Sequence, residues 1–181
     1  MISSKKNELR TRYRRERHER YLESSFAFIL ESPEFSKAAT IASYISYGDE
    51  PSTFELNTAI IATGKVLVLP RVSGTNIEWV IWNGDMSHLL ESKRILEPIG
   101  DPLVDVSSIE VVVVPALRID RLGYRLGQGG GFYDRALPRF QAWKIGLIHS
   151  DEISGEDLPH EVHDIALDAA ATPNLIIRFH Q

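Results

Sequence analysis

A glycine-rich stretch from Asp120 to Asp134 holds the residues of this sequence that are best suited to chemistry. It contains five glycines, two arginines and two acids, and it follows the apolar run 111–117. Glycines let backbone N–H groups approach a phosphate closely, and the start of a following helix adds positive charge there. Arg125 supplies a full positive charge, and Asp134 a carboxylate that can hold a metal ion. The pattern therefore predicts a loop that binds a phosphorylated ligand.

The loop departs from the familiar nucleotide motifs. It lacks the lysine followed by serine or threonine that ends a P-loop, and Phe132 stands where a G-x-G-x-x-G pattern requires its last glycine. A flexible surface turn is the alternative interpretation of a run of glycines. The charges of Arg121, Arg125 and Asp134 around a triple glycine exceed what a turn requires, so we favour the binding loop.

Length and composition indicate one soluble globular domain over residues 1–181. Of the 181 residues, 43% are hydrophobic and 25% charged, which excludes a disordered or fibrous chain. Without cysteine the chain forms no disulfide and no thiolate site. No apolar run approaches the roughly 20 residues that span a bilayer, and the N-terminus lacks the features of a signal peptide. We therefore expect a cytoplasmic protein with no membrane partner.

The charge is unevenly distributed along the chain. Residues 1–20 contain eight Lys or Arg against three Glu, a net +5, whereas the remaining residues sum to −10. Such a basic arm is typical of nucleic-acid binding, of a helix that reaches over an anionic small-molecule site, or of a solvated helix face. The acidic body, a pI near 5.7 and only Tyr13 and Tyr21 as aromatic residues in this region disfavour nucleic acid.

The elements that must position the glycine loop can be predicted from hydrophobic spacing. Apolar residues from Leu9 to Leu30 recur mostly at intervals of four, which predicts one or two helices over residues 4–31, closed by Pro33. Residues 40–47 form a predicted strand that ends in the turn 48–51. A capping box over residues 52–55 then opens a helix that runs to about Thr63 and stops at Gly64. Residues 65–70 are a second strand.

The order strand, helix, strand predicts a βαβ unit with parallel strands. Residues 77–82 are an expected hairpin or edge strand, and residues 111–115 and 143–148 are further buried strands. Active groups in parallel sheets gather at the carboxyl ends of strands. Glu50, Arg71 and the glycine loop all follow predicted strands, so we expect them to meet in one crevice.

The glycine loop also carries a family resemblance. The run Arg125 to Asp134 resembles the signature of 5-formyltetrahydrofolate cyclo-ligases, in which an Arg-Leu-Gly run leads through glycines to an aromatic-Tyr-Asp ending. Residues 6–10 resemble the family's N-terminal Lys/Arg helix, residues 43–50 its first strand and folate-binding turn, and residues 163–168 before Thr172 and Pro173 its C-terminal acidic segment. The resemblance spans nearly the whole chain, and the glycine loop is its most specific part.

The resemblance implies a fold and a reaction. The implied fold is α/β, a three-layer α/β/α sandwich with a mostly parallel, Rossmann-like sheet of the CoA-transferase-like type. The implied enzyme is an ATP-dependent, C–N bond-forming ligase that converts 5-formyltetrahydrofolate to 5,10-methenyltetrahydrofolate, ADP and phosphate. The γ-phosphate moves to the formyl oxygen, N10 attacks the activated carbon, and phosphate leaves. Mg²⁺ is the expected cofactor, ATP the co-substrate and a monomer the expected state.

Residue roles follow from the same resemblance. Arg125, Tyr133 and Asp134 are the expected catalytic residues, and Asp134 and Asp164 the expected magnesium ligands. Ile45 and Glu50 belong to the folate pocket, and Arg71 is added from its place after a strand as a ligand for phosphate or for the glutamate tail. The expected ATP-binding residues are Lys6, Asn7, Glu8, Leu9, Arg10, Arg125, Leu126, Gly127, Gln128, Gly129, Gly130, Gly131, Phe132 and Tyr133.

Several residues keep a second interpretation. Asp164 suits a loop turn, Arg71 a surface ion pair and Ile45 the sheet core. Gln128 and Phe132 differ from the residues common in the family, which leaves substrate affinity less defined than the reaction. A histidine metal site is disfavoured, because the histidines match no zinc pattern. The rival functions are a nucleic-acid-binding protein that uses the basic helix and a folate- or nucleotide-binding member of the same fold that lacks turnover.

Overall fold

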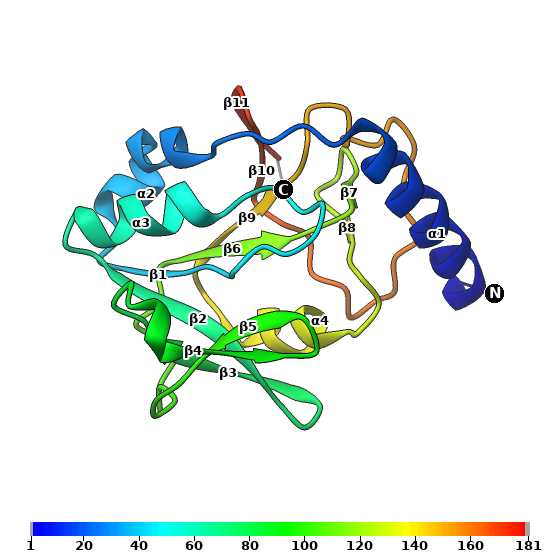
Figure 1. Ribbon diagram of the computed structural model, residues 1–181. Coiled ribbons are helices and arrows are strands. Elements are labelled where there is room, and N and C mark those ends of the chain that lie inside the picture. Colours follow the sequence, from blue (N-terminus) through cyan, green and yellow to red (C-terminus); the bar gives the residue numbers. More distant parts are fainter. Residues whose placement is uncertain (1, 180–181) are drawn as a thin grey trace.

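The centre of the molecule is a seven-stranded sheet, seen in a computed structural model that describes residues 2–179 (Figure 1). Its order is β11 (Leu175–Arg178), β10 (Ala169–Thr172), β9 (Trp143–Leu147), β6 (Val111–Pro115), β1 (Thr40–Ala42), β2 (Val66–Ser73) and β3 (Asn76–Ile81). Two small hairpins flank it: β4 (Leu89–Ser92) with β5 (Ile95–Pro98), and β7 (Arg118–Ile119) with β8 (Arg125–Leu126). The helices are α1 (Ile2–Arg20), η1 (Ala27–Glu31), α2 (Pro33–Lys37), α3 (Phe54–Ala62), η2 (Met86–His88), α4 (Phe132–Ala136) and η3 (Leu137–Arg139).

The sheet is mostly parallel, which confirms the predicted α/β class. Neighbouring strands run parallel from β2 through β1, β6 and β9 to β10, and only the edge strands β3 and β11 are antiparallel. Helix α3 connects β1 to β2, so the predicted βαβ unit is present. Residues 77–82 were expected at an edge, and β3 occupies that position.

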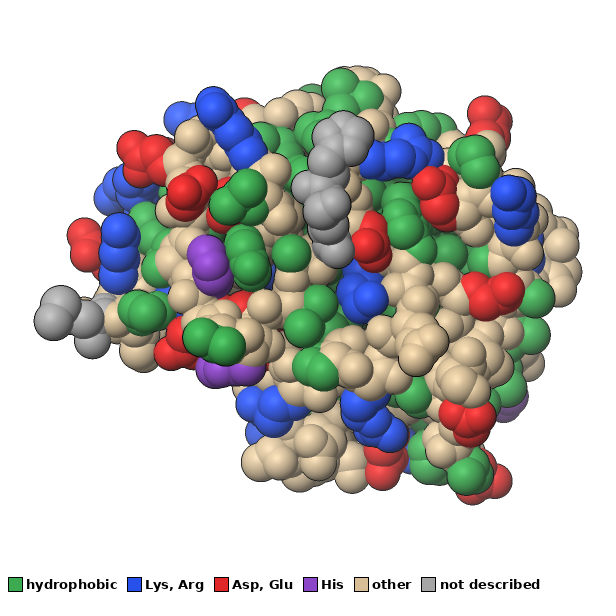
Figure 2. Space-filling model, turned by 180° about the vertical axis from the view of Figure 1, so that it is seen from behind, with side chains coloured by type: hydrophobic (Ala, Val, Ile, Leu, Met, Phe, Trp, Pro, Cys, Tyr) green, Lys and Arg blue, Asp and Glu red, His purple; other side chains and the backbone are tan. Residues whose placement is uncertain are grey.

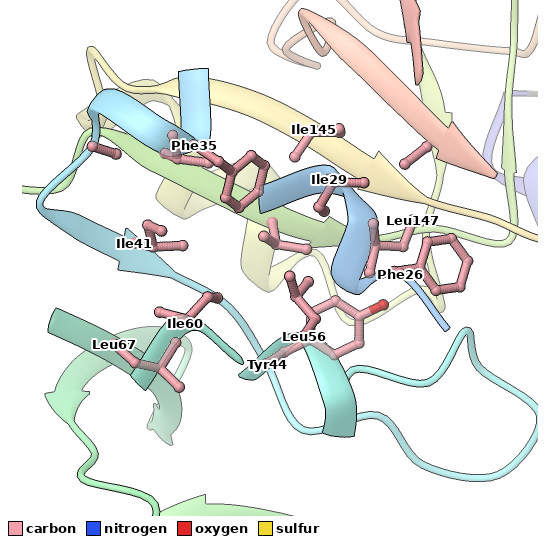
Figure 3. Close-up of a cluster of buried hydrophobic side chains, with 14 of the residues drawn as sticks. Phe26, Ile29, Phe35, Ile41, Tyr44, Leu56, Ile60, Leu67, Ile145 and Leu147 are labelled. Atoms are coloured by element: carbon pink, nitrogen blue, oxygen red, sulfur yellow. The ribbon is translucent and has the colours of Figure 1, made fainter. Parts of the chain in front are cut away.

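Alternating side chains of the buried strands fill both faces of the sheet. Ile41, Val113 and Ile145 pack on one side with η1, α2 and α3, as Figure 3 shows for Ile41 and Ile145 together with Phe35 and Leu56. Val112, Val114 and Ala170 pack on the other side with α4 and η3. Strands that are buried on both faces need near-continuous apolar sequence, and the run 111–114 supplies it. The result is a helix, sheet and helix layering (Figure 1).

The predicted strand 40–47 is wrong beyond Ala42. Strand β1 has only three residues, because the carbonyl of Tyr44 is taken by side chains instead of a neighbouring strand. Thr53 Oγ1 donates to it at 2.7 Å, and Asn57 Nδ2 donates at 2.9 Å. The chain thus leaves the sheet early and forms an irregular segment that leads to Glu50.

The predicted capping box over residues 52–55 is wrong, because α3 begins one residue later than a box with Ser52 as its N-cap requires. The N-cap of α3 is Thr53, and its hydroxyl makes no capping hydrogen bond because it is committed to Tyr44. The predicted end of this helix is confirmed, since α3 stops at Ala62 and Gly64 takes the left-handed conformation with φ 76°.

The N-terminal region only partly follows the predicted apolar spacing. Helix α1 buries Tyr13 and half-buries Leu9, but Leu22 is 76% exposed and lies in the irregular segment after Arg20. Pro33 does not merely close the region, since it is the first residue of α2, where its missing N–H costs nothing. Among residues 2–179, no helix is long and apolar enough to cross a membrane.

Candidate active site

The glycine loop connects β8 to α4 and curves beside α1. Gly129 and Gly131 have φ angles of 109° and 66°, which residues with a side chain rarely adopt. A Cβ on Gly129 would lie 3.4 Å from the guanidinium of Arg10, and one on Gly131 only 2.7 Å from Arg135 Nη1. The positive φ angles therefore require glycine at both positions, and two arginine side chains lie close to the loop.

The helix that follows the loop is shorter than expected. Helix α4 contains five residues, a little more than one turn, so its dipole adds little to an anion site. The positive charge at the loop comes instead from α1, which Figure 1 shows at the end of the sheet toward which β6 points. Arg10 Nε donates to Gly127 O at 3.0 Å, and Arg14 Nη2 donates to Gln128 O at 2.6 Å.

Two acids predicted as metal ligands each lie beside a cation. Lys6 Nζ is 2.7 Å from Asp164 Oδ2, and Arg125 Nη2 is 2.5 Å from Asp134 Oδ1. Burial lowers the pKa of Arg10, and Arg14 lowers it further, whereas Asp134 and Asp164 raise it. Both carboxylates therefore lie within Coulombic reach of one guanidinium.

The environment of Asp164 favours the ionised form. Partial burial opposes ionisation, but hydrogen bonds from Lys6 Nζ and from the backbone N–H of Glu161 hold its pKa below the usual value. Ligand atoms of Glu161, His163 and Asp164 all lie within 4.8 Å of one another. Two other histidines are not part of this group: His149 contacts the backbone carbonyl of Asp49 and the ring of Tyr21, and His160 stacks on Tyr124.

Glu50 is the buried acid of the site. It is only 6% exposed and follows the irregular segment after β1. Burial raises the pKa of Glu50 to about 7, although the backbone N–H of Tyr47, the charge of Arg17 and the amide of Gln128 each act in the opposite direction. A carboxyl group with a pKa near neutrality is typical of a functional site.

Two tyrosine hydroxyls close to Glu50 are buried and have no hydrogen-bond partner among residues 2–179. They belong to Tyr44 and Tyr133, and burial followed by the charge of Glu50 raises the pKa of each. Buried hydroxyls are normally hydrogen-bonded, so unpaired ones that line a cavity leave capacity for a ligand.

A cavity of about 270 Å³ joins these groups. It is lined by Ile45 and Glu50 on one side, by Arg125 and most of the glycine loop on another, and by Asp134. A second cavity of about 210 Å³ lies between α1 and residues 47–50, and shares Tyr47, Glu50 and Gln128 with the first. Segments that are some 80 positions apart in the sequence thus enclose one space.

The structure brings most, but not all, of the predicted residues together. Lys6 and Arg10 lie on the α1 side of the loop, while Asn7 accepts a hydrogen bond from Arg10 and Glu8 is exposed. Leu9 and Leu126 pack in a small apolar cluster with Tyr13, so their side chains serve packing.

Arg71 differs from the sequence expectation. It lies inside β2, which continues to Ser73, rather than after a strand. Its guanidinium bonds to Glu78 Oε2 at 2.7 Å and to the carbonyl of Gly100 at 2.9 Å, and it is not among the residues that line either cavity. Through these contacts Arg71 links β2 to β3 and to the segment after β5.

Sequence reasoning missed other residues of the cavity wall. Tyr44, Val72, Ile77, Ile95 and Glu97 line it, and they come from four separate segments. Tyr44 could have been predicted, because it lies within residues 43–50, the segment that resembles the family's first strand and folate-binding turn. Ile95 and Glu97 lie in a segment with no distinctive pattern, so their place depends on how the β4–β5 hairpin folds.

Comparison with known proteins gives a consistent result. The sequence model of the 5-formyltetrahydrofolate cyclo-ligase family matches residues 3–173. A 5-formyltetrahydrofolate cyclo-ligase of Escherichia coli K12 is 32% identical over 152 residues, covering 80% of this chain and 83% of that protein. One from Mycolicibacterium smegmatis is 32% identical over 143 residues, with 74% and 73% covered.

Solved structures agree with the sequence comparison. The NMR structure of 5,10-methenyltetrahydrofolate synthetase from Aquifex aeolicus superposes with a TM-score of 0.82 at 29% identity, and covers 100% of this chain and 94% of that one. A synthetase from Mycoplasma pneumoniae gives a TM-score of 0.67 at 21% identity, which is a likeness of fold, with 91% and 96% covered.

Proposed function

This chain belongs to the 5-formyltetrahydrofolate cyclo-ligase family, and we propose that its two substrates meet in the cavity between the Glu50 turn and the glycine loop. The enzyme uses ATP to cyclise 5-formyltetrahydrofolate to 5,10-methenyltetrahydrofolate, with release of ADP and phosphate. One observation carries the proposed location: a single cavity is lined by the predicted folate residues Ile45 and Glu50 and by the predicted nucleotide loop.

The nucleotide half of the site consists of the loop and α1. Lys6 and Arg10 supply charge for the ATP phosphates, and Arg125, whose side chain is 4% exposed, supplies it from the loop. Phosphoryl transfer depends mainly on positioning and on charge stabilisation, which backbone amides and cations provide. The missing P-loop lysine is thereby replaced by residues of the N-terminal helix.

The folate half of the site is the buried end of the cavity. The carboxylate of Glu50 accepts hydrogen bonds from ring nitrogens of the folate, and the unpaired hydroxyls of Tyr44 and Tyr133 bond to the same ring system. The apolar wall formed by Ile45 and Ile77 excludes water from the activated carbon. Exclusion of water matters because a phosphorylated formyl group hydrolyses easily.

The reaction then needs three changes at the formyl group. The γ-phosphoryl group passes from ATP to the formyl oxygen, and the bond between that group and the bridging oxygen of ADP breaks. N10 attacks the formyl carbon and loses its proton, and the carbon–oxygen bond breaks as phosphate leaves. Arg125 neutralises charge on the transferred group, and Tyr133 lies beside the reacting face.

Asp134 and Asp164 are suited to hold Mg²⁺. Both offer hard oxygen atoms, both lie near Arg10, and Mg²⁺ in nucleotide sites is bound by one or two carboxylates together with phosphates. When bound, the ion neutralises phosphate charge. Lys6 pairs with Asp164, and Arg125 pairs with Asp134.

The remaining properties are inferences of the same kind. We infer one cyclo-ligase domain over residues 1–181, supported by one sheet that contains strands from both halves of the chain. We expect a monomer that is located in the cytoplasm. Light scattering of the purified protein tests whether it is a monomer.

Nucleic-acid binding is disfavoured by how α1 is used. Arg12, Arg17 and Arg20 pair with acids, and Arg10 and Arg14 donate to the glycine loop. Figure 2 shows basic and acidic side chains interspersed on the side of the molecule that carries α1, instead of a continuous basic surface. Tight, salt-sensitive binding to generic RNA or DNA would contradict this inference.

The activity itself is tested with purified protein, Mg-ATP and 5-formyltetrahydrofolate. We expect a near-ultraviolet absorbance from the conjugated methenyl bridge, together with equimolar ADP. Folate and nucleotide binding without either product would instead identify a family member that lacks turnover.

A further inference from the structure

Gln128 lies where the two cavities of the site meet. The larger cavity is lined by Ile45 and the glycine loop, and the smaller one lies between α1 and residues 47–50. Gln128 and Glu50 line both cavities, whereas Arg14 lines only the smaller one. The side chain of Gln128 is thus placed between a cation of α1 and the buried acid of the folate pocket.

Arg14 holds Gln128 at two points. Arg14 Nε donates to the side-chain Oε1 of Gln128 at 2.9 Å, and Arg14 Nη2 donates to the backbone carbonyl of the same residue at 2.6 Å. A guanidinium is planar, so its nitrogens hold both oxygens in a fixed arrangement. Since Oε1 is the only acceptor of the side-chain amide and it faces Arg14, the NH₂ group is the end that remains for another partner.

Glu50 is the partner that this NH₂ group reaches. Burial raises the pKa of Glu50 to about 7, and a hydrogen bond from the side chain of Gln128 acts in the opposite direction. The backbone N–H of Tyr47 also donates to Glu50 Oε2, but at 3.3 Å, which is longer than most N–H···O bonds. The amide of Gln128 is therefore the side-chain donor that can fix the carboxylate.

Arg17 is another cation near Glu50, but its hydrogen bonds go elsewhere. Arg17 Nε and Nη2 donate to Glu152 at 2.7 and 2.6 Å, and Nη2 also donates to Ala116 O. The remaining Nη1 has no hydrogen-bond partner within residues 2–179. Arg17 thus acts on Glu50 through its charge, and the orientation of the carboxylate depends on Gln128.

We propose that Gln128 is a positioning residue that holds the carboxylate of Glu50 for the folate ring, and that Arg14 orients Gln128 from α1. This role rests on the proposed function, in which Glu50 accepts hydrogen bonds from the folate. It makes folate affinity depend on Arg14, although Arg14 is not among the residues that line the folate cavity.

Loss of the amide should change how folate binding depends on pH. Hydrogen bonds to a charged group shift its titration by about one pH unit, and without the amide the neutral acid is favoured. The ionised form is the one that accepts from the folate ring. Gln128→Met, which keeps the length of the side chain, should therefore bind folate about fivefold more weakly than wild type at pH 7 and almost equally at pH 9.

The test measures the Kd for 5-formyltetrahydrofolate by calorimetry, without ATP, between pH 6 and pH 9. The midpoint of the pH dependence should rise by about one unit in Gln128→Met, and by less in Arg14→Met, where the amide is kept but not oriented. The double variant should behave like Gln128→Met alone, because Arg14 acts through Gln128. Arg15→Met, which removes an exposed cation of α1, is the control and should match the wild type.

Other charged or titratable groups surround Glu50 and must be separated from it. They come from the segment before Glu50 (Tyr44, Tyr47 and Asp49), from α1 (Arg14, Arg17 and His18), from the glycine loop and α4 (Arg125, Tyr133 and Asp134) and from the segment after β9 (His149 and Glu152). Glu50→Gln keeps all of them, so any pH dependence that this variant retains comes from these groups.

The outcomes distinguish this role from the proposed function. If the wild type does not bind the folate, or if Glu50→Gln binds it with the wild-type pH dependence, the proposed place of folate at Glu50 is wrong. If Glu50→Gln loses the pH dependence but Gln128→Met weakens binding equally at pH 7 and pH 9, Gln128 only supports the loop. If the effects of Arg14→Met and Gln128→Met add, Arg14 acts by its charge and does not orient Gln128.

Discussion

Lys6 and Asp164 lie 158 positions apart in the chain, yet Lys6 Nζ donates to Asp164 Oδ2 at 2.7 Å. The contact joins the first helix to the C-terminal acidic segment. Each side chain is almost buried, with 13% and 11% exposed. The relationship places a cation of α1 and a predicted metal ligand at one point, next to the glycine loop.

Replacement of Lys6 tests its role in ATP binding. Hydrogen bonds to charged groups contribute more than neutral ones, so Lys6→Ala should raise the KM for ATP roughly tenfold or more. The KM for folate should change little. Lys5→Ala, which alters an exposed neighbouring cation, is the matched control. If the KM for ATP is unchanged in Lys6→Ala, Lys6 does not bind ATP and serves only to pair with Asp164.

Replacement of Asp134 tests its role as a metal ligand. Asp134→Asn keeps the shape of the side chain but removes its charge, so turnover with Mg-ATP should fall by roughly a hundredfold. Folate binding, measured by calorimetry without ATP, should persist. Asp105→Asn, in an exposed loop, should have neither effect. Full activity of Asp134→Asn at low magnesium concentration would show that another residue holds the ion.

Glu50 should make folate use depend on pH. Its pKa is about 7, and in the role proposed for it the ionised form accepts hydrogen bonds from the ring, so kcat/KM for folate should fall about tenfold per unit below pH 7. Glu50→Gln should lower kcat/KM and abolish this dependence. A wild-type profile that is flat between pH 5.5 and 7.5, or a Gln variant with the same slope, would be inconsistent with this role.

The same acid should affect stability in the opposite direction. The folded state keeps the proton of Glu50 between pH 4.5 and about 7, whereas the unfolded state has released it. The free energy of unfolding therefore falls as pH rises through this window, by roughly 3 kcal/mol in all. Urea unfolding of wild type and Glu50→Gln at pH 5 and pH 8 should show the variant to be relatively more stable at pH 8. If the unfolding free energies of wild type and Glu50→Gln differ by the same amount at pH 5 and at pH 8, Glu50 keeps an ordinary pKa.

The ion pair of Arg17 with Glu152 should anchor α1. Both side chains are 3% exposed, and Arg17 also donates to Ala116 O at 2.6 Å. Arg17→Ala leaves the buried carboxylate of Glu152 without its cation, with only the backbone N–H of His149 still donating to it, so we expect a loss of about 3–5 kcal/mol in unfolding free energy. Arg20→Ala removes an exposed pair with Asp151 and should have little effect. Similar thermal stability of both variants would contradict the anchoring role.

The sequence predicted the parts of the fold that depend on local pattern. The buried strands predicted at 111–115 and 143–148, the second of which is observed over Trp143–Leu147, the βαβ unit and the edge strand near residue 77 all follow from apolar runs and spacing. The strand 40–47 was too long because the side chains of Thr53 and Asn57 capture the carbonyl of Tyr44. Such a contact depends on tertiary structure and leaves no periodic signal.

The residues of the candidate site were likewise only partly predictable from the sequence. Glu50, Arg125 and Asp134 were identifiable from the loop pattern and the family resemblance. The cavity wall at Ile95 and Glu97 was not, because it depends on how β4 and β5 pair and cover β2. Arg71 shows the converse: its position after apolar residues suggested a site, but a longer strand gave its guanidinium structural partners.

The central claim is that ATP and 5-formyltetrahydrofolate react with each other in one cavity, and an isotope measurement tests it most directly. The substrate is labelled with ¹⁸O at the formyl oxygen, turned over with Mg-ATP, and the released phosphate is analysed by mass spectrometry, with a sample lacking enzyme to measure exchange with water. We expect each phosphate to carry one ¹⁸O atom and to match the methenyl product in amount. Unlabelled phosphate formed alongside the methenyl product would show that the γ-phosphoryl group never reaches the formyl oxygen, and would contradict the account.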